Sequence, residues 1–256
     1  MLKIKKMLKS KDFKTSLTFS IIGLIASVFL GVYQTSTFTE SMEQQIISQL
    51  GSTHALILVA AMQGFLLTFI ASFFGLKIAK KVSLYLNFKY DKKSMILAIL
   101  IGFATGLIIT FSDQFIFAKY LSSEMTSYIF SLVYFISSIL YGGIVEEILL
   151  RLFMMSLLVW ILWKLFAKSK DYLNIPHWIY IFSIVLSSIL FAAGHLPATA
   201  QLFGISIPIL IRMFVLNGIG GLGFGYLYWK HGLAYSMVAH VTTHIFMQIL
   251  FIPILS

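Results

Sequence analysis

The sequence predicts an all-α protein, a polytopic bundle of seven or eight transmembrane helices. Of the 256 residues, 59% are hydrophobic and 11% are charged, whereas a soluble domain carries about 25% charged residues. Apolar segments long enough to cross a bilayer recur along the chain. In a soluble protein the net charge of +10 would suggest nucleic acid. Here the lysines cluster between apolar segments, as in cytoplasmic loops, so we expect a lipid bilayer and no nucleic acid as partners.

The first three spans follow the distribution of lysine. Residues 1–14 hold six lysines, which predicts a cytoplasmic N-terminus, and no small-residue cleavage site follows, so we expect an uncleaved first span. We predict spans at 16–33, 55–76 and 95–111. The loop after the first contains Glu40 and Glu43 and no basic residue, and six lysines follow the second. After the third, an outer loop holds Asp113, Lys119 and Glu124.

The segment 126–163 leaves the number of spans open. It has room for two helices broken near Gly142-Gly143, or for one span followed by a partly embedded helix. Lysines at positions 164, 168 and 170 favour an inside location for the next loop, which requires an odd number of crossings here. Three further spans are expected at 178–194, 207–229 and 233–252, with prolines near their ends. We divide the chain into an N-terminal three-span region, 1–124, and a core, 125–256.

Glycine is concentrated in the span predicted at 207–229. The five glycines of this span are Gly218, Gly220, Gly221, Gly223 and Gly225. Gly221 and Gly225 have the small-xxx-small spacing that allows two membrane helices to approach closely. The pattern predicts close helix packing there, with room for a cavity beside the thin helix.

Two adjacent carboxylates and a guanidinium lie in the middle of an apolar segment. Single ionisable groups at such depth cost several kcal/mol unless they are paired or hydrated. On a helix, Glu147 and Arg151 are four residues apart and share a face, so we expect them to pair. Glu146 is rotated by about 100° from Glu147. It keeps a carboxylate without a local partner, which makes it the first candidate for chemistry.

Three histidines accompany this carboxylate. His195 ends one predicted span, and His240 and His244 lie one turn apart on one face of the last. Ionisable residues inside a membrane usually have a function. In a chain with so few polar groups, three histidines and an unpaired Glu146 point to a shared site. The chain has no cysteine, which excludes a thiol nucleophile, a thiolate metal site and a disulfide framework.

Three chemistries would use Glu146, His195, His240 and His244. Glu146 could act as general base for a water, with His195 holding that water and the other two histidines donating hydrogen bonds to a developing oxyanion. The histidine pair could instead bind zinc with His195 or Glu146, although Val241 stands where the His-Glu-x-x-His signature needs glutamate. The third possibility is a proton relay in a transporter, but we find no inverted repeat of broken helices. A serine nucleophile is disfavoured, because no Gly-x-Ser-x-Gly motif occurs.

Three motifs in order resemble a known family. They are Glu146-Glu147-x-x-x-Arg151, Phe191-x-x-x-His195 and His240-x-x-x-His244. Over residues 125–250 the chain is similar to the CPBP (CAAX protease and bacteriocin-processing, or Abi) family of intramembrane endopeptidases. The resemblance implies a metal-independent membrane protease of the glutamic type, in which Glu146 and His195 activate water. It also implies that His240 and His244 stabilise the oxyanion and that Glu147 and Arg151 are structural.

One position departs from the family pattern. Many members have asparagine where this chain has His244; histidine still donates a hydrogen bond, but it also favours a metal site. Zinc bound by His195, His240 and His244 therefore remains the second interpretation of the site, against no cofactor in the first.

The family resemblance also frames the expected substrate. Relatives remove the last residues of prenylated CAAX proteins, or take part in bacteriocin maturation, self-immunity and pheromone processing. Seventeen lysines against two arginines are typical of a low-GC Gram-positive bacterium. We therefore expect an integral protein of a bacterial cell membrane that acts on a peptide or membrane-protein substrate. The alternative is a non-catalytic immunity or scaffold protein that binds a bacteriocin or its receptor.

Overall fold

The computed structural model describes residues 10–86, 88–121, 130–168 and 171–255. Within these ranges the chain is helical, and seven helical segments are long and apolar enough to cross a membrane. The predicted all-α polytopic bundle is confirmed. Several residues used in the predictions lie outside the described ranges, namely Lys3, Lys5, Lys6, Lys9, Glu124 and Lys170.

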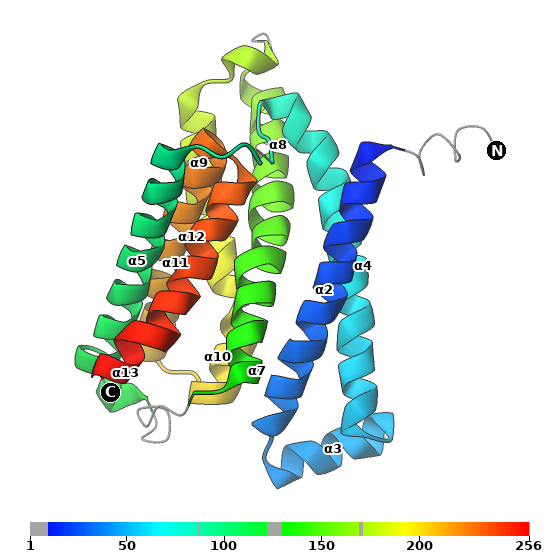
Figure 1. Cartoon of the computed structure of the whole chain (residues 1–256), viewed down its shortest axis with the longest axis vertical. Coiled ribbons are helices and arrows are strands. Elements are labelled where there is room, and N and C mark those ends of the chain that lie inside the picture. Colours follow the sequence, from blue (N-terminus) through cyan, green and yellow to red (C-terminus); the bar gives the residue numbers. More distant parts are fainter. Residues whose placement is uncertain (1–9, 87, 122–129, 169–170, 256) are drawn as a thin grey trace, which may run out of the picture.

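The first two spans form a hairpin at one side of the molecule (Figure 1). α2 (Lys11–Ser36) and α4 (Thr53–Ala79) pack against each other, and the short α3 (Glu40–Leu50) joins them across one end. The 3-10 turn η1 (Lys80–Val82) ends the hairpin at the other end. The hairpin packs on the fourth span, because α2 contacts η3 (Ser138–Glu146) and α4 contacts η4 (Ile148–Met155).

The remaining spans form the main bundle. The third span is α5 (Lys92–Phe115), followed by the turn η2 (Ala118–Tyr120). The fourth consists of α7 (Leu132–Ser137), η3, η4 and α8 (Ser156–Phe166). After η5 (Tyr172–Asn174) come α9 (His177–Gly194) with the short α10 (Leu196–Phe203), and then α11 (Ile207–His231). The last span comprises α12 (Leu233–Ile245), η6 (Phe246–Phe251) and α13 (Ile252–Leu255).

The fourth span is continuous from Leu132 to Phe166. The alternative of two helices broken near Gly142-Gly143, and with it the count of eight spans, is wrong. Both glycines lie inside η3 and face α12: a β-carbon on Gly142 would lie 2.6 Å from Nε2 of His244. They serve close packing between helices, and the backbone hydrogen bonds of the helix continue through them.

Polar side chains define several helix ends. The helices α2, α3, α4, α5 and α7 each follow a residue whose side-chain oxygen accepts a hydrogen bond from a backbone N–H three residues on, namely Ser10, Thr39, Ser52, Asp91 and Ser131. Such caps satisfy donors that the helix leaves unpaired. At α5, the hydroxyl and the backbone N–H of Ser94 donate to Asp91 and hold the pKa of that carboxyl below its usual value.

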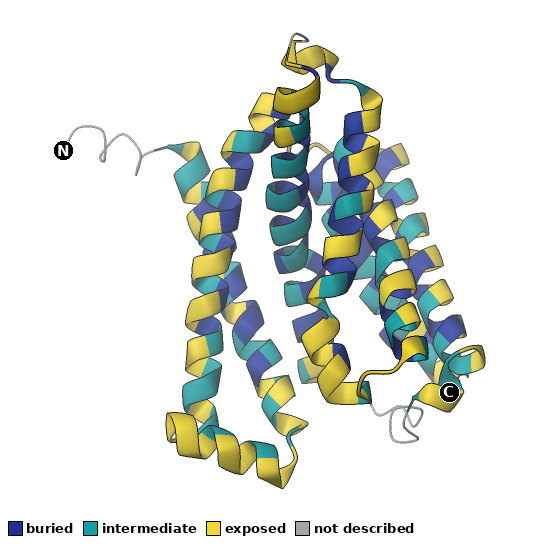
Figure 2. Ribbon diagram, turned by 180° about the vertical axis from the view of Figure 1, so that it is seen from behind, coloured by how far each residue is buried: buried dark blue, intermediate teal, exposed yellow. Residues whose placement is uncertain are grey.

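Buried residues lie on the inward faces of the spans and exposed residues on the outward faces (Figure 2), and at several contacts between spans the buried residues are small. α5 shows the pattern most clearly, since its buried residues are all small: Ser94, Ala98, Gly102, Thr105, Gly106, Thr110 and Ser112. This is how membrane helices approach closely. The glycines of α11 follow the prediction, because a β-carbon on Gly221 would meet Ser188 of α9 and one on Gly225 would meet Ile184. Gly218 faces open space.

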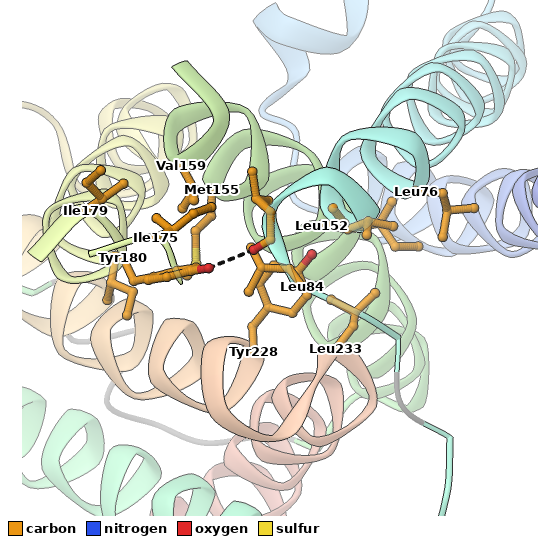
Figure 3. Close-up of a cluster of buried hydrophobic side chains, with 14 of the residues drawn as sticks. Leu76, Leu84, Leu152, Met155, Val159, Ile175, Ile179, Tyr180, Tyr228 and Leu233 are labelled. Carbon is orange, nitrogen blue, oxygen red and sulfur yellow. Dashed lines mark hydrogen bonds between the residues drawn. The ribbon is translucent and has the colours of Figure 1, made fainter. Parts of the chain in front are cut away.

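A large apolar core joins the hairpin to the bundle at the lysine-rich end. Leu76 of α4, Leu84 of the following loop and Leu152 of η4 belong to one buried cluster with Tyr228 of α11 (Figure 3). The hydroxyl of Tyr180 donates to the carbonyl of Val82 in the same cluster, at 2.8 Å. The division at residues 124 and 125 remains a prediction; α5, which precedes it, packs against α12 and η6.

The predicted outer loop after the third span begins later than expected. Asp113 lies in the last turn of α5, and the guanidinium of Arg212 in α11 donates two hydrogen bonds of 2.6 Å to its carboxylate. Such bidentate pairs of arginine and carboxylate are among the stronger charge-assisted hydrogen bonds. The pair links α5 to α11 near the end opposite the lysines, and two residues 99 positions apart give no local signal for it.

Candidate active site

The carboxylates of the site lie on a helix that is wound more widely than an α-helix. η3 and η4 are π-helical over nine and eight residues, and Glu147 lies at their junction. Most π-helical segments are single turns, and they are frequent at functional sites. Glu146 is the last residue of η3, so both carboxylates lie where one widened segment meets the next.

Glu147 is the centre of a buried polar network. Its Oε2 lies 3.5 Å from Nε of Arg151, and both side chains are fully buried. The hydroxyl of Ser236 donates a short hydrogen bond to the same carboxylate, and Nδ1 of His240 lies 3.0 Å from Oε1. The predicted pairing with Arg151 is confirmed. The contacts with Ser236 and His240 were not predicted, although these two residues share a face of α12 at the spacing of one turn.

His240 connects the buried carboxylate to the less buried one. A carboxylate paired with a guanidinium is ionised and only accepts hydrogen bonds, so Nδ1 of His240 carries the proton toward Glu147. Nε2, on the other side of the ring, faces Glu146 with 4.0 Å between it and Oε2. The side chain of Glu146 is 20% exposed, whereas that of Glu147 is inaccessible. Two neighbouring residues of one type therefore have different surroundings.

Two phenylalanines hold the cationic and imidazole groups. The ring of His240 stacks on Phe224 at 4.5 Å between centroids and meets the ring of Phe191 edge-on at 5.8 Å. The guanidinium of Arg151 lies 4.9 Å from the centre of the Phe191 ring and 5.8 Å from that of Phe224. Aromatic faces stabilise cations in this position. Phe191 belongs to a motif found in the sequence, but nothing in the sequence indicated Phe224.

The remaining two histidines, His244 and His195, contact the site through different neighbours. His244 stacks on His240 at 5.1 Å, with its Nε2 against Gly142. His195 follows the last residue of α9, where its Nδ1 lies 2.9 Å from the carbonyl of Phe191 and its ring meets the Phe191 ring at 4.8 Å. Glu146, His240 and His244 thus come together directly. His195 is joined to them through the Phe191 ring.

The described ranges contain no group of three or more His, Cys, Asp or Glu side chains that could hold a metal ion. The choice between a site without a cofactor and zinc bound by His195, His240 and His244 remains a prediction. The roles assigned to the individual site residues, in either interpretation, remain predictions.

Two cavities lie toward the lysine-rich end of the bundle, and none of the predicted site residues lines them. One, of about 250 Å³, borders Phe88 and Tyr235; the other, of about 560 Å³, borders Lys80 and Leu152. A water-filled cavity at Glu146 remains a prediction, as does the room for a cavity expected beside the glycine-rich span.

Comparison with known proteins found one match, to a region that contains the candidate site residues. Residues 128–246 match the family model described as "Type II CAAX prenyl endopeptidase Rce1-like". This range contains all three motifs, from Glu146 to His244. Searches of curated proteins and of solved structures found no match. The match confirms the resemblance seen in the motifs and implies a protease. Residues 128–246 are therefore similar to the Rce1-like type II CAAX prenyl endopeptidases of the CPBP family, and the seven long apolar helices indicate an integral membrane protein.

Proposed function

We propose that this protein is an intramembrane endopeptidase in which Glu146 activates the hydrolytic water without a metal. The match of residues 128–246 to a family of proteases supports the reaction class. The observation that carries the mechanism is the contrast between neighbours: Glu147 is committed to Arg151, whereas Glu146 is partly exposed and faces Nε2 of His240 at 4.0 Å. A free carboxylate next to a hydrogen-bonding imidazole is the arrangement that a general base requires.

The reaction proceeds in two proton transfers. Glu146 takes a proton from water as the oxygen attacks the carbonyl carbon of the scissile peptide bond, and His195 positions that water. The tetrahedral intermediate then breaks its C–N bond while Glu146 returns the proton to the leaving nitrogen. The products are a new carboxyl terminus and a new amino terminus, and Glu146 ends in its starting state. This cycle needs one water and no other reactant.

His240 and His244 stabilise the oxyanion of the intermediate. With Nδ1–H held by Glu147, His240 can donate from Nε2 only as the imidazolium, and the buried carboxylate stabilises that cation, as in serine protease triads. A donor aimed at an oxyanion is worth about 10²–10³ in kcat.

The substrate we propose is a peptide or a membrane protein in a bacterial cell membrane. The candidate roles are bacteriocin or pheromone processing, self-immunity and CAAX-type cleavage. Prenylated substrates are less favoured, because the high ratio of lysine to arginine resembles that of low-GC Gram-positive bacteria. We expect a cytoplasmic N-terminus, because the positive-inside rule assigns lysine-rich helix ends to that side. The matched region is similar to CAAX prenyl endopeptidases, and this likeness supports only the general reaction, peptide-bond hydrolysis in a membrane.

The test compares peptides released by cells expressing the wild type, Glu146→Gln or Glu43→Gln. Glu43→Gln is the matched control, because it removes one carboxylate from the exposed α3, away from the site. Peptides present with the wild type and Glu43→Gln but missing with Glu146→Gln identify the substrate and support the proposal. Identical peptide sets in all three strains would contradict it.

Two further readouts separate the alternatives. A zinc enzyme loses activity to a chelator and regains it with metal, whereas the proposed enzyme is unaffected by either. A non-catalytic immunity protein would still protect its cell from the bacteriocin when Glu146→Gln and His195→Ala are combined. If the protein acts as the proposed enzyme, cells with this double variant lose that protection.

A further inference from the structure

The larger of the two cavities lies at the seam between the N-terminal hairpin and the fourth span. It has a volume of about 560 Å³, within the range of small-molecule sites, which are about 300–1,000 Å³. Its rim includes Lys11, Asp12 and Thr15 from the start of α2, and Lys80 from the end of the hairpin. The rim therefore lies where two spans begin or end, at the level of a membrane surface.

The inner wall of the cavity is apolar. Leu76, Leu84 and Leu152 line it, and Figure 3 shows these three side chains together, contributed by α4, the following loop and η4. Leu84 and Leu152 are almost completely buried by the rest of the protein. Tyr172 closes one side, where its carbonyl accepts a hydrogen bond of 3.1 Å from the hydroxyl of Ser83. A polar rim over an apolar interior is suited to an amphiphile.

The rim carries a positive charge that the protein does not neutralise. Nζ of Lys80 lies 2.5 Å from Oδ1 of Asp12, which pairs these two charges. Lys11, on the same rim, forms no ion pair among the described residues. The surrounding helix ends are rich in lysine, and besides Asp12 only Asp91 and Asp171 are acidic among the residues described there. An occupant with a negative headgroup is therefore favoured over a neutral one.

From this geometry we infer that the cavity binds an anionic phospholipid. The headgroup phosphate lies at Lys11 and Lys80, and an acyl chain enters between the hairpin and η4 as far as Leu152. Each lysine at a membrane surface increases the affinity for anionic lipid by about fivefold. Leu152 directly follows Arg151, so the bound chain would contact the helix that carries both site carboxylates. The inference does not depend on the proposed protease activity.

Native mass spectrometry of the full-length protein in detergent tests this inference. The protein is titrated with dioleoyl phosphatidylglycerol or with dioleoyl phosphatidylcholine. We expect a first site that prefers phosphatidylglycerol. The double variant Lys11→Gln, Lys80→Gln should bind phosphatidylglycerol about fivefold or more weakly and should bind phosphatidylcholine as the wild type does. The matched control, Lys164→Gln with Lys168→Gln, removes two exposed lysines at the same end that do not line the cavity, and it should leave that first site intact.

A second variant tests the acyl-chain compartment independently of charge. Thr15→Trp places a large ring into the cavity from a partly exposed position on α2 and should weaken both lipids. The inference is overturned if the two lipids bind the wild type equally, or if the control pair weakens phosphatidylglycerol as much as the cavity pair. It is also overturned if Thr15→Trp changes neither lipid, or if glycerol phosphate alone displaces phosphatidylglycerol at equal concentration, which would indicate a site for a free anion.

Discussion

At the scale of single residues, the site separates two glutamates that are adjacent in the chain. Glu147 is inaccessible and hydrogen-bonded by Ser236 and His240, with Arg151 beside it. The ion-pair contact of Glu146 is longer, with 4.0 Å between its Oε2 and Nε2 of His240. A buried ion pair is costly to break, whereas a carboxylate without a close partner can exchange protons. The expected consequences of changing each residue therefore differ in kind.

Removing the partner of Glu147 should damage stability. Arg151→Met leaves a fully buried carboxylate without its cation, which typically costs about 3–5 kcal/mol. Arg212→Met, which breaks the more exposed pair with Asp113, should cost less. Thermal unfolding of both variants in detergent measures the difference. Unfolding of Arg151→Met at the wild-type temperature would show that the pair is not structural.

The position of His244 distinguishes hydrogen bonding from other roles of the ring. His244→Ala removes the donor and should lower kcat by about 10²–10³. His244→Asn keeps a donor, so its kcat should stay within about tenfold of the wild type. Peptide-cleavage rates at saturating substrate provide the measurement. Equal loss in both variants would mean that the imidazole itself, and not a hydrogen bond, is required.

At the scale of elements, close packing of the fourth and seventh spans forms the site. Gly142 in η3 leaves the space that the His244 ring of α12 occupies. The contact explains why a glycine stands in the middle of a span, and it couples the packing of two helices to the position of a site residue.

A methyl group at Gly142 should therefore displace His244. Gly142→Ala would bring its β-carbon to 2.6 Å from Nε2 of His244, so we expect kcat to fall at least about tenfold while the helices remain folded. Gly218→Ala is the matched control, because its β-carbon would meet nothing within 4 Å. That variant should keep its activity and gain about 0.5–1 kcal/mol of stability from reduced backbone freedom. Full activity in Gly142→Ala would remove His244 from the site.

Much of this could be predicted from local patterns, and the exceptions have physical reasons. Spacing of four residues predicted the pairing of Glu147 and Arg151, and hydropathy predicted the spans. Gly142-Gly143 was ambiguous, because glycine marks either a helix break or a close approach, and only the facing helix decides which. The contacts of Glu147 with Ser236 and His240 join residues about ninety positions apart, and such distances leave no trace in one sequence.

At the scale of the whole molecule, seven spans predict that the start of α2 and the end of α13 lie on opposite sides of the membrane. α2 begins at the lysine-rich end, and α13 lies at the other end (Figure 1). One crossing between Leu132 and Phe166 also returns the chain to the lysine side at Lys168, as the distribution of positive charge requires.

This topology can be measured directly because the chain lacks cysteine. Single substitutions Gln45→Cys, Lys168→Cys and Ile254→Cys each introduce one exposed thiol for an impermeant maleimide. We expect Gln45→Cys and Ile254→Cys to react in intact cells, and Lys168→Cys only after the cytoplasmic face is opened. Reaction of Lys168→Cys and Ile254→Cys from the same side would contradict a seven-span chain.

The central claim is that Glu146 is the base that activates water. Its most direct test is kcat of the purified wild type and of Glu146→Gln on the same peptide, with a metal chelator present and folding verified by thermal unfolding. The account predicts wild-type activity that the chelator does not affect and a loss of about 10²–10⁴ in the variant. A folded Glu146→Gln protein that cleaves at the wild-type rate would contradict it.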